Sequence, residues 1–156
     1  MAQILVLCTG NSVRSILAEA AFRRDGAGRL RVWSAGTNPT GRVNPAVLAF
    51  LARKGMPAQG LRSKSLAEFA APAAPRIDLV LTLCTAAATE AGPDLPGSPV
   101  AVLWDMADPS LVAPDQLDLS IQQAFHQLSA RVNGFLALPV ERMSPPAMAE
   151  ALERLA

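Results

Sequence analysis

Four short stretches of the chain are rich in apolar residues and are separated by segments of mixed polarity. They are QILVLC at 3–8, RLRVWSAG at 29–36, IDLVLTLC at 77–84 and VAVLW at 100–104. The second stretch alternates apolar and polar residues, whereas the other three are nearly continuous apolar runs. Such runs are typical of strands in a parallel sheet that is covered on both faces.

Apolar residues at helical spacing fill the segments around these strands. The predicted helices span 13–25, 45–54, about 117–138 and about 146–155. Strands alternating with helices predict an α/β fold, which we expect to be a single domain over residues 1–156. The sheet is predicted to have four parallel strands with helices on both faces, and the last helix to be docked or peripheral.

Three chemically distinctive segments follow the predicted strands directly. Cys8 ends the first strand, Cys84 ends the third, and WDMADP at 104–109 follows the fourth. Ligands of open parallel sheets bind at the carboxyl ends of the strands. We therefore expect these segments to meet at one edge of the sheet and to form the functional site.

Composition and charge narrow the choice of partner. The 156 residues are 51% hydrophobic and 17% charged, with a net charge of +1. This composition excludes a disordered chain and predicts neither a nucleic-acid nor a membrane partner. The sequence also indicates no signal peptide and no apolar stretch long enough to span a bilayer, so we expect a cytoplasmic protein with reduced thiols.

The cysteine count argues against a metal centre. Cys8 and Cys84 are the two cysteines, and His126 is the one histidine. A structural zinc site uses four ligands, so these residues do not suffice on their own. We expect no metal or organic cofactor.

The loop CTGNSVRS at 8–15 has the pattern of an oxyanion cradle. Between a strand and a helix, successive backbone N–H groups turn inward and the helix N-terminus adds positive potential. Gly10 tolerates unusual backbone angles, and Arg14 supplies a planar fork suited to a tetrahedral oxyanion. Cys8 at the centre would be held as a thiolate, to which Ser15 could donate a hydrogen bond. The loop predicts a cysteine nucleophile acting on phosphate-like anions.

The pattern Cys-x5-Arg-Ser after the first strand resembles the low-molecular-weight protein tyrosine phosphatase superfamily, which includes a branch of arsenate reductases. CTGNSVRS is similar to the reductase form CTGNS-x-RS. The similarity continues, in the same order, in WSAGT at 33–37, VNP at 43–45, LRSKSLAEF at 61–69, LVLTLC at 79–84 and ADP at 107–109. The resemblance implies the phosphatase-type fold and a thiol-dependent arsenate reductase.

The resemblance also implies a role for each site residue. Cys8 attacks the oxyanion, Asp108 of the Asp-Pro pair protonates the departing oxygen, and Cys84 resolves the Cys8–arsenic adduct as a disulfide. The expected substrate-binding residues are Thr9, Gly10, Asn11, Ser12, Val13, Arg14 and Ser15. Asp105 is expected to be solvated or to bond the loop. If the first and third strands are neighbours, their spacing of about 4.8 Å suits the Cα separation of a disulfide.

Two departures from the reductase pattern affect the reductant and the cation. Thioredoxin-linked reductases carry a third cysteine where this chain has Ala91 and Gly92. An external thiol, such as glutathione with glutaredoxin or thioredoxin, must then complete the cycle. Asn11, Glu19 and Ser34 match residues that hold the loop, or a potassium ion beneath it, in related reductases. The segment RSKS at 62–65 lacks the aspartate that some relatives use, which argues against a potassium site, and Arg62 and Lys64 are expected to be solvated.

Two alternatives remain at this point. The first is a phosphatase that hydrolyses phosphomonoesters through a Cys8 phosphoenzyme. Against it, DPSL at 108–111 lacks the aromatic residues that wall a phosphotyrosine ring, and the chain has no tyrosine. The second is a regulatory protein that binds arsenate, phosphate or sulfate in the cradle without turnover.

Overall fold

Four parallel strands form one sheet in the order β2-β1-β3-β4. The computed structural model describes residues 1–90 and 94–156. Its strands are β1 (Ala2–Cys8), β2 (Leu30–Gly36), β3 (Leu79–Thr82) and β4 (Val100–Leu103). Its α-helices are α1 (Arg14–Asp25), α2 (Pro45–Arg53), α3 (Thr85–Thr89), α4 (Leu117–Leu136) and α5 (Pro145–Arg154). The predicted α/β fold and its four parallel strands are confirmed.

Strand β1 lies inside the sheet, which explains why its sequence is an unbroken apolar run from Ile4 to Cys8. It pairs with β2 so that Cys8 is opposite Gly36, and with β3 so that Leu7 is opposite Thr82. The third strand is shorter than predicted, because it ends at Thr82. Cys84 therefore follows the strand as the residue before α3. The first and third strands are neighbours, as the disulfide argument required.

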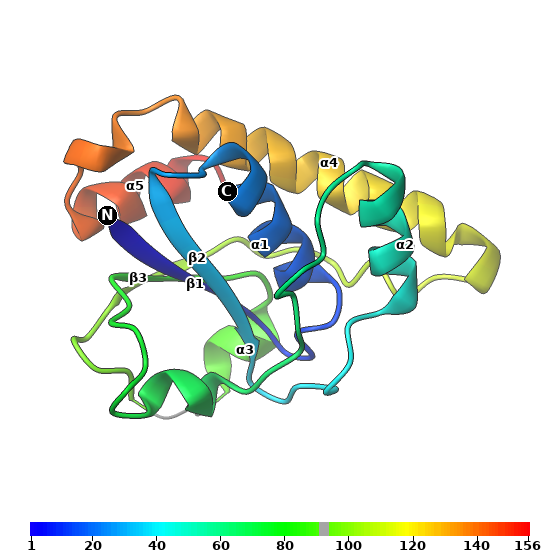
Figure 1. Ribbon diagram of the computed structural model, residues 1–156, viewed down its shortest axis with the longest axis horizontal. Helices are drawn as coiled ribbons and strands as arrows, with labels where there is room; N and C mark the ends of the chain where they lie inside the picture. The colour runs from blue at the N-terminus through cyan, green and yellow to red at the C-terminus, as the bar shows by residue number, and fades with distance from the viewer. Residues whose placement is uncertain (91–93) are drawn as a thin grey trace.

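The two faces of the sheet are covered unequally. Ile4 and Val6 point into a large core formed with α1, α2, α4 and α5, while Leu5 and Leu7 point into a smaller core on the other face. The smaller core includes Phe69, from the 3₁₀ helix η1 (Leu66–Ala70). In Figure 1, α3 lies on the opposite side of the strands from α1 and α4. Helices thus cover both faces, as predicted, with the longer ones on one side.

Caps and a buried indole fix the helix ends around this sheet. Asn44 Oδ1 accepts the N–H of Ala46 at 2.9 Å and begins α2 at Pro45. The buried Trp104, just after β4, donates its Nε1–H to the carbonyl of Leu152 in α5 at 2.7 Å. None of the described helices is long and apolar enough to cross a membrane.

Candidate active site

The loop that joins β1 to α1 places Cys8 at the carboxyl edge of the sheet. Cys8 is 2% exposed, and the buried Asn11 in the middle of the loop has φ of 45°. This is the left-handed region, which asparagine tolerates better than most residues. The loop then enters α1, whose first helical residue is Arg14. The first turn of α1 and the loop amides therefore face the same space above Cys8.

A strap, residues 37–44, holds the outer side of this loop. Four backbone N–H groups of the strap donate to four loop carbonyls at 3.0–3.2 Å. The pairs are Thr37 to Cys8, Asn38 to Thr9, Thr40 to Gly10 and Asn44 to Ser12. Because the carbonyls are engaged on the outside, the loop N–H groups are left for an anion inside.

Gly36 allows the strap to approach the loop this closely. A Cβ atom at this position would lie 2.5 Å from the carbonyl oxygen of Thr9 and 3.0 Å from Asn11 Cβ. The first of these neighbours is backbone, so it cannot turn aside. Gly36, the glycine of WSAGT, is thus required by the close approach of the loop backbone. It belongs to the site although it has no reactive side chain.

A cavity of about 260 Å³ opens above the loop. Its walls come from the loop, from the strap and from the segment after β4. They are lined by Cys8, Gly10, Asn11, Ser12, Val13, Arg14, Thr40, Asn44, Asp108 and Ser110. The size suits a tetrahedral oxyanion with its water. The structure thereby brings Cys8, Arg14 and Asp108 to one cavity, with most of the predicted substrate-binding residues.

The hydrogen bonds beneath Cys8 have a fixed direction. The backbone N–H of Lys64 donates to Asn11 Oδ1 at 2.9 Å, which sets the orientation of the amide. Asn11 Nδ2 must then donate to Ser15 Oγ at 2.7 Å. The hydroxyl hydrogen of Ser15 is therefore free for Cys8 Sγ, 2.9 Å away. A hydroxyl directed at the sulfur is placed to stabilise the negative charge of an attacking thiolate, the nucleophilic form of a cysteine.

The same amide orients a buried carboxylate. Asn11 Nδ2 also donates to Ser34 Oγ at 2.9 Å, and the Ser34 hydroxyl donates to Glu19 Oε2. Glu19 is fully buried, and its Oε1 lies 2.5 Å from Arg23 Nη2 while its Oε2 lies 4.0 Å from Lys64 Nζ. Burial raises the pKa of Glu19, against hydrogen bonding from Ser34 and the charges of Lys64 and Arg23. A cluster of ionisable side chains thus lies directly beneath the loop.

Lys64 corrects an expectation drawn from the sequence. A lysine in RSKS was expected to be solvated, yet Lys64 is 7% exposed and its neighbour Arg62 pairs with Glu68 outside. Burial lowers the pKa of Lys64, an effect that the nearby Glu19 carboxylate opposes. No local pattern in the sequence indicated this burial, because it follows from the contact of this segment with the loop, where Ser63 Oγ donates to the Gly10 carbonyl.

Arg14 and Asp108 face each other across the cavity. Arg14 Nη1 donates to the Met106 carbonyl at 2.9 Å, and its Nη2 lies 3.8 Å from Asp108 Oδ2. Asp108 Oδ1 accepts both the N–H and the hydroxyl of Ser110, at 2.9 and 2.7 Å. These bonds fix the carboxyl so that Oδ2 remains turned toward the cavity. The expected loop-bonding residue Asp105 accepts the N–H of Thr85 at 3.3 Å, at the start of α3.

Cys84 lies next to the nucleophile. Cys8, Cys84 and Ala87 form one small buried cluster, and both cysteines are free thiols. Thr9 Oγ1 is 3.6 Å from Cys84 Sγ. The structure therefore brings together all four residues for which the sequence predicted a catalytic role. Ala91 and Gly92, which stand where a third cysteine was expected, lie outside the described residues.

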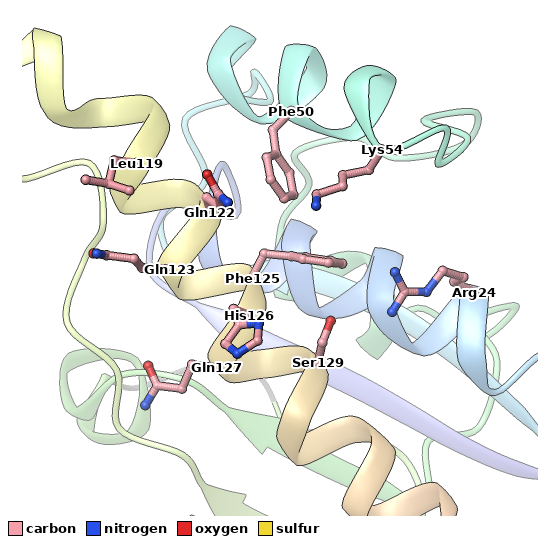
Figure 2. A pocket seen from close by; sticks show the side chains of 10 residues that line it. All are labelled: Arg24, Phe50, Lys54, Leu119, Gln122, Gln123, Phe125, His126, Gln127 and Ser129. Atoms are coloured by element: carbon pink, nitrogen blue, oxygen red, sulfur yellow. The ribbon is translucent and has the colours of Figure 1, made fainter.

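A larger cavity lies elsewhere in the described residues. It measures about 660 Å³ and lies between the end of α1, α2 and α4 (Figure 2). Phe50 and Phe125 pack there with ring centroids 5.1 Å apart, and Arg24 lies over Phe125 at 5.4 Å. None of the predicted site residues lines this groove. Its floor is part of the core, and nucleophile and oxyanion cradle both belong to the smaller cavity.

Metal-binding groups do not gather in the part of the chain that the structure describes. No three histidine, cysteine, aspartate or glutamate side chains lie together as potential ligands there. The site contains a buried sulfur nucleophile, an anion cradle, a carboxyl group across the cavity and a second sulfur. This set can attack an oxyanion, protonate a leaving oxygen and give two electrons to the bound anion as the two thiols become a disulfide.

Comparisons with known proteins agree with this geometry. The family described as low molecular weight phosphotyrosine protein phosphatase matches residues 3–132. Glutaredoxin arsenate reductase from Synechocystis sp. (strain ATCC 27184 / PCC 6803 / Kazusa) is 32% identical over 84 residues, which are 54% of this chain and 61% of that protein. The chain thus spans about three fifths of the length of this relative.

Two solved structures of arsenate reductases also share the architecture. One, in an intermediate state, has a TM-score of 0.68 and 26% identity, covering 88% of this chain and 98% of that one. The other, in a phosphate-binding state, has a TM-score of 0.65 and 27% identity with the same coverage. Both structures match nearly their whole length, so the likeness extends over most of this fold.

Proposed function

The chain belongs to the low molecular weight phosphotyrosine protein phosphatase family, and we propose that within this family it is a thiol-dependent arsenate reductase, which reduces arsenate to arsenite. The observation that carries the proposal is the cluster of Cys8 with Cys84. Hydrolysis of a phosphomonoester needs the first sulfur alone. Reduction needs a second one, and this chain keeps its other cysteine beside the nucleophile.

The first step transfers arsenic to Cys8. The thiolate, supported by Ser15, attacks arsenic(V) held by the loop amides and Arg14. A sulfur–arsenic bond forms and one arsenic–oxygen bond breaks. The departing oxygen takes a proton from Asp108 Oδ2, which faces Arg14 at 3.8 Å, and leaves as water. General acid catalysis of this kind contributes about 10²–10⁴ in rate.

The second step is the reduction itself. The Cys84 sulfur attacks Cys8 Sγ and releases its thiol proton. A sulfur–sulfur bond forms while the sulfur–arsenic bond breaks, and its electron pair stays on arsenic. Arsenic(V) becomes arsenic(III) and leaves as arsenite, and the two sulfurs have together lost the two electrons that arsenic gained. Neighbouring strands β1 and β3 support the short approach that this disulfide needs.

An external thiol returns the enzyme to its starting state. Two thiol groups reduce the Cys8–Cys84 disulfide by thiol–disulfide exchange and become a disulfide themselves. Glutathione with glutaredoxin suits a chain with two cysteines, and the similarity to a glutaredoxin arsenate reductase supports this choice over thioredoxin. Both thiols must be reduced before each turnover, so we propose that the protein acts in the cytoplasm.

The test follows one turnover without any reductant. Reduced protein is mixed with arsenate, and free thiols, disulfide-linked peptides and arsenic species are measured by mass spectrometry and arsenic speciation. The proposal expects one arsenite per chain together with a Cys8–Cys84 disulfide. Cys84→Ser should release no arsenite on its own, whereas Thr89→Ser, an exposed change on α3, should behave as the unaltered protein does.

Two intact thiols and no arsenite would remove this mechanism. The family description then favours the phosphatase as the second candidate. An aryl phosphate assay decides that case, because hydrolysis needs Cys8 alone and Cys84→Ser would keep full turnover. Binding of phosphate and arsenate without either reaction would leave the non-catalytic anion-binding protein.

A further inference from the structure

The Lys64 side chain ends beneath the anion-binding loop. Its side chain is 5% exposed, and its Nζ lies 4.0 Å from Glu19 Oε2 and donates to the Arg62 carbonyl at 3.2 Å. Lysine is almost never buried unless it is paired. Neither reaction step described above uses this ammonium group. The burial of this ammonium group therefore needs an explanation other than these two steps.

The residues around it are those that, by resemblance, hold the loop or a potassium ion in related reductases. In this chain the polar atoms of Asn11 and Ser34 are engaged in hydrogen bonds to each other. They also bond Ser15, Glu19 and the backbone N–H of Lys64. A potassium ion takes oxygen ligands and would have to share Glu19 with an ammonium of the same charge. The residues present do not fit a potassium ion.

We propose that the Lys64 ammonium is a built-in cation, which balances Glu19 beneath the loop and takes the place of a bound potassium ion. Lys64 is then a positioning residue. Its charge fixes Glu19, Glu19 accepts from Ser34, and Ser34 accepts from Asn11, whose amide supports the loop. The inference concerns the anion cradle and stands whichever oxyanion the cradle binds.

Arg23 is the other cation at Glu19, and it differs from Lys64 in exposure. Its side chain is 39% exposed, so water and salt screen its charge, whereas the Lys64 side chain is 5% exposed. Arg23 also comes from the same helix as Glu19, four residues on. Lys64 joins α1 to the segment before η1 and so links the helix, the loop and that segment.

The experiment compares thermal unfolding in potassium chloride and in choline chloride at equal ionic strength, with no arsenate present. Lys64→Met keeps the length of the side chain and the backbone N–H that Asn11 accepts, and it removes the charge together with the hydrogen bond to the Arg62 carbonyl. Lys54→Met is the matched control, because Lys54 is the chain's other lysine and is exposed on the surface. A third variant, Glu19→Gln with Lys64→Met, removes both charges.

The unaltered protein and Lys54→Met should have the same Tm in both salts. Lys64→Met should melt roughly 10 °C lower in choline chloride, from the cost of breaking a buried ion pair. Potassium should recover part of this loss in a saturable manner, because it can now enter beside Glu19. The double variant should show no response to potassium.

Three results would overturn the inference. They are a Tm of Lys64→Met that equals that of Lys54→Met, a loss that potassium does not reverse, and an equal potassium response in the unaltered protein. If Lys64→Met does not fold, the double variant decides. Folding of the double variant alone supports charge balance, whereas failure of both shows that the lysine acts through packing. None of these outcomes depends on whether the protein reduces arsenate.

Discussion

Replacing Ser15 by alanine tests the direction of the hydrogen bonds beneath the nucleophile. Ser15 is fully buried, and its Oγ lies 2.9 Å from Cys8 Sγ. Because Asn11 Nδ2 donates to the same oxygen, the hydroxyl hydrogen belongs to the sulfur. A hydrogen bond to a charged group contributes about 1.5–3 kcal/mol. Its loss should slow the reaction of Cys8 with an electrophile by about 10- to 100-fold, since about 1.36 kcal/mol corresponds to a factor of ten.

The assay is the rate of Cys8 alkylation by iodoacetamide at neutral pH. Both proteins carry Cys84→Ser, so that a single thiol reacts. The Ser15→Ala protein should react more slowly by this factor, because its sulfur has lost the hydroxyl that lies 2.9 Å away. Ser12→Ala is the control, since the Ser12 hydroxyl donates to the Arg42 carbonyl at 2.9 Å, away from the sulfur.

An unchanged alkylation rate in Ser15→Ala would refute the reasoning. It would mean that the hydroxyl hydrogen is directed elsewhere and that Asn11 does not set the polarity of the network. An equal loss of rate in Ser12→Ala would refute it in another way, because the effect would then come from disturbing the loop as a whole.

Three further changes probe the strap, the acid and an exposed ion pair. Gly36→Ala places a Cβ against the Thr9 carbonyl, so it should destabilise the fold by about 1–3 kcal/mol and weaken phosphate binding. Denaturant unfolding measures the first effect and calorimetry the second. Unchanged values would show that the contact is not tight. Asp108→Asn should slow arsenite release about 10²–10⁴-fold in a single-turnover assay, while Asp105→Asn should leave the rate nearly unchanged. Equal rates in the two variants would contradict the role of Asp108 as the acid. Hydrogen bonding from Arg29 lowers the pKa of Glu141 to about 2, so the stabilisation from this pair is present above the usual value near 4.5 and is lost as pH falls toward 2. Glu141→Gln should lack that part of the acid dependence in Tm measurements from pH 5 to about 2, and an unaltered profile would contradict the assignment.

Sequence patterns predicted the sheet well because burial is nearly complete there. Every position from Ile4 to Cys8 is buried, so an uninterrupted apolar run was the necessary outcome. Long helices were also predicted within a few residues, since their buried faces repeat every turn. The 3₁₀ helix at 66–70 and the five-residue α3 were missed. Elements this short contain too few turns to produce a periodic pattern.

The site was predicted unevenly for a related reason. Cys8 and Arg14 belong to one local motif, so their spacing along the chain reports their spacing in the fold. Lys64 lies 53 residues from Asn11, and it reaches the loop only because Gly36 pairs with Lys64 and Ser65. Taken on its own, a segment as polar and basic as RSKS is expected to be exposed to solvent. Its burial follows from tertiary packing that no local window contains.

The strap also determines which changes of sequence the loop can accept. The shape of the loop depends on hydrogen bonds between backbone N–H and carbonyl groups. Every residue other than proline has both groups. Side chains at Thr9 and Ser12 can therefore vary without rebuilding the cradle. Asn11 and Gly36 lack this freedom, because one holds the left-handed turn and the other permits contact, and Val13 lacks it because its side chain is buried in the large core. A library that varies the two open positions while fixing these three would retain anion binding in most of its members.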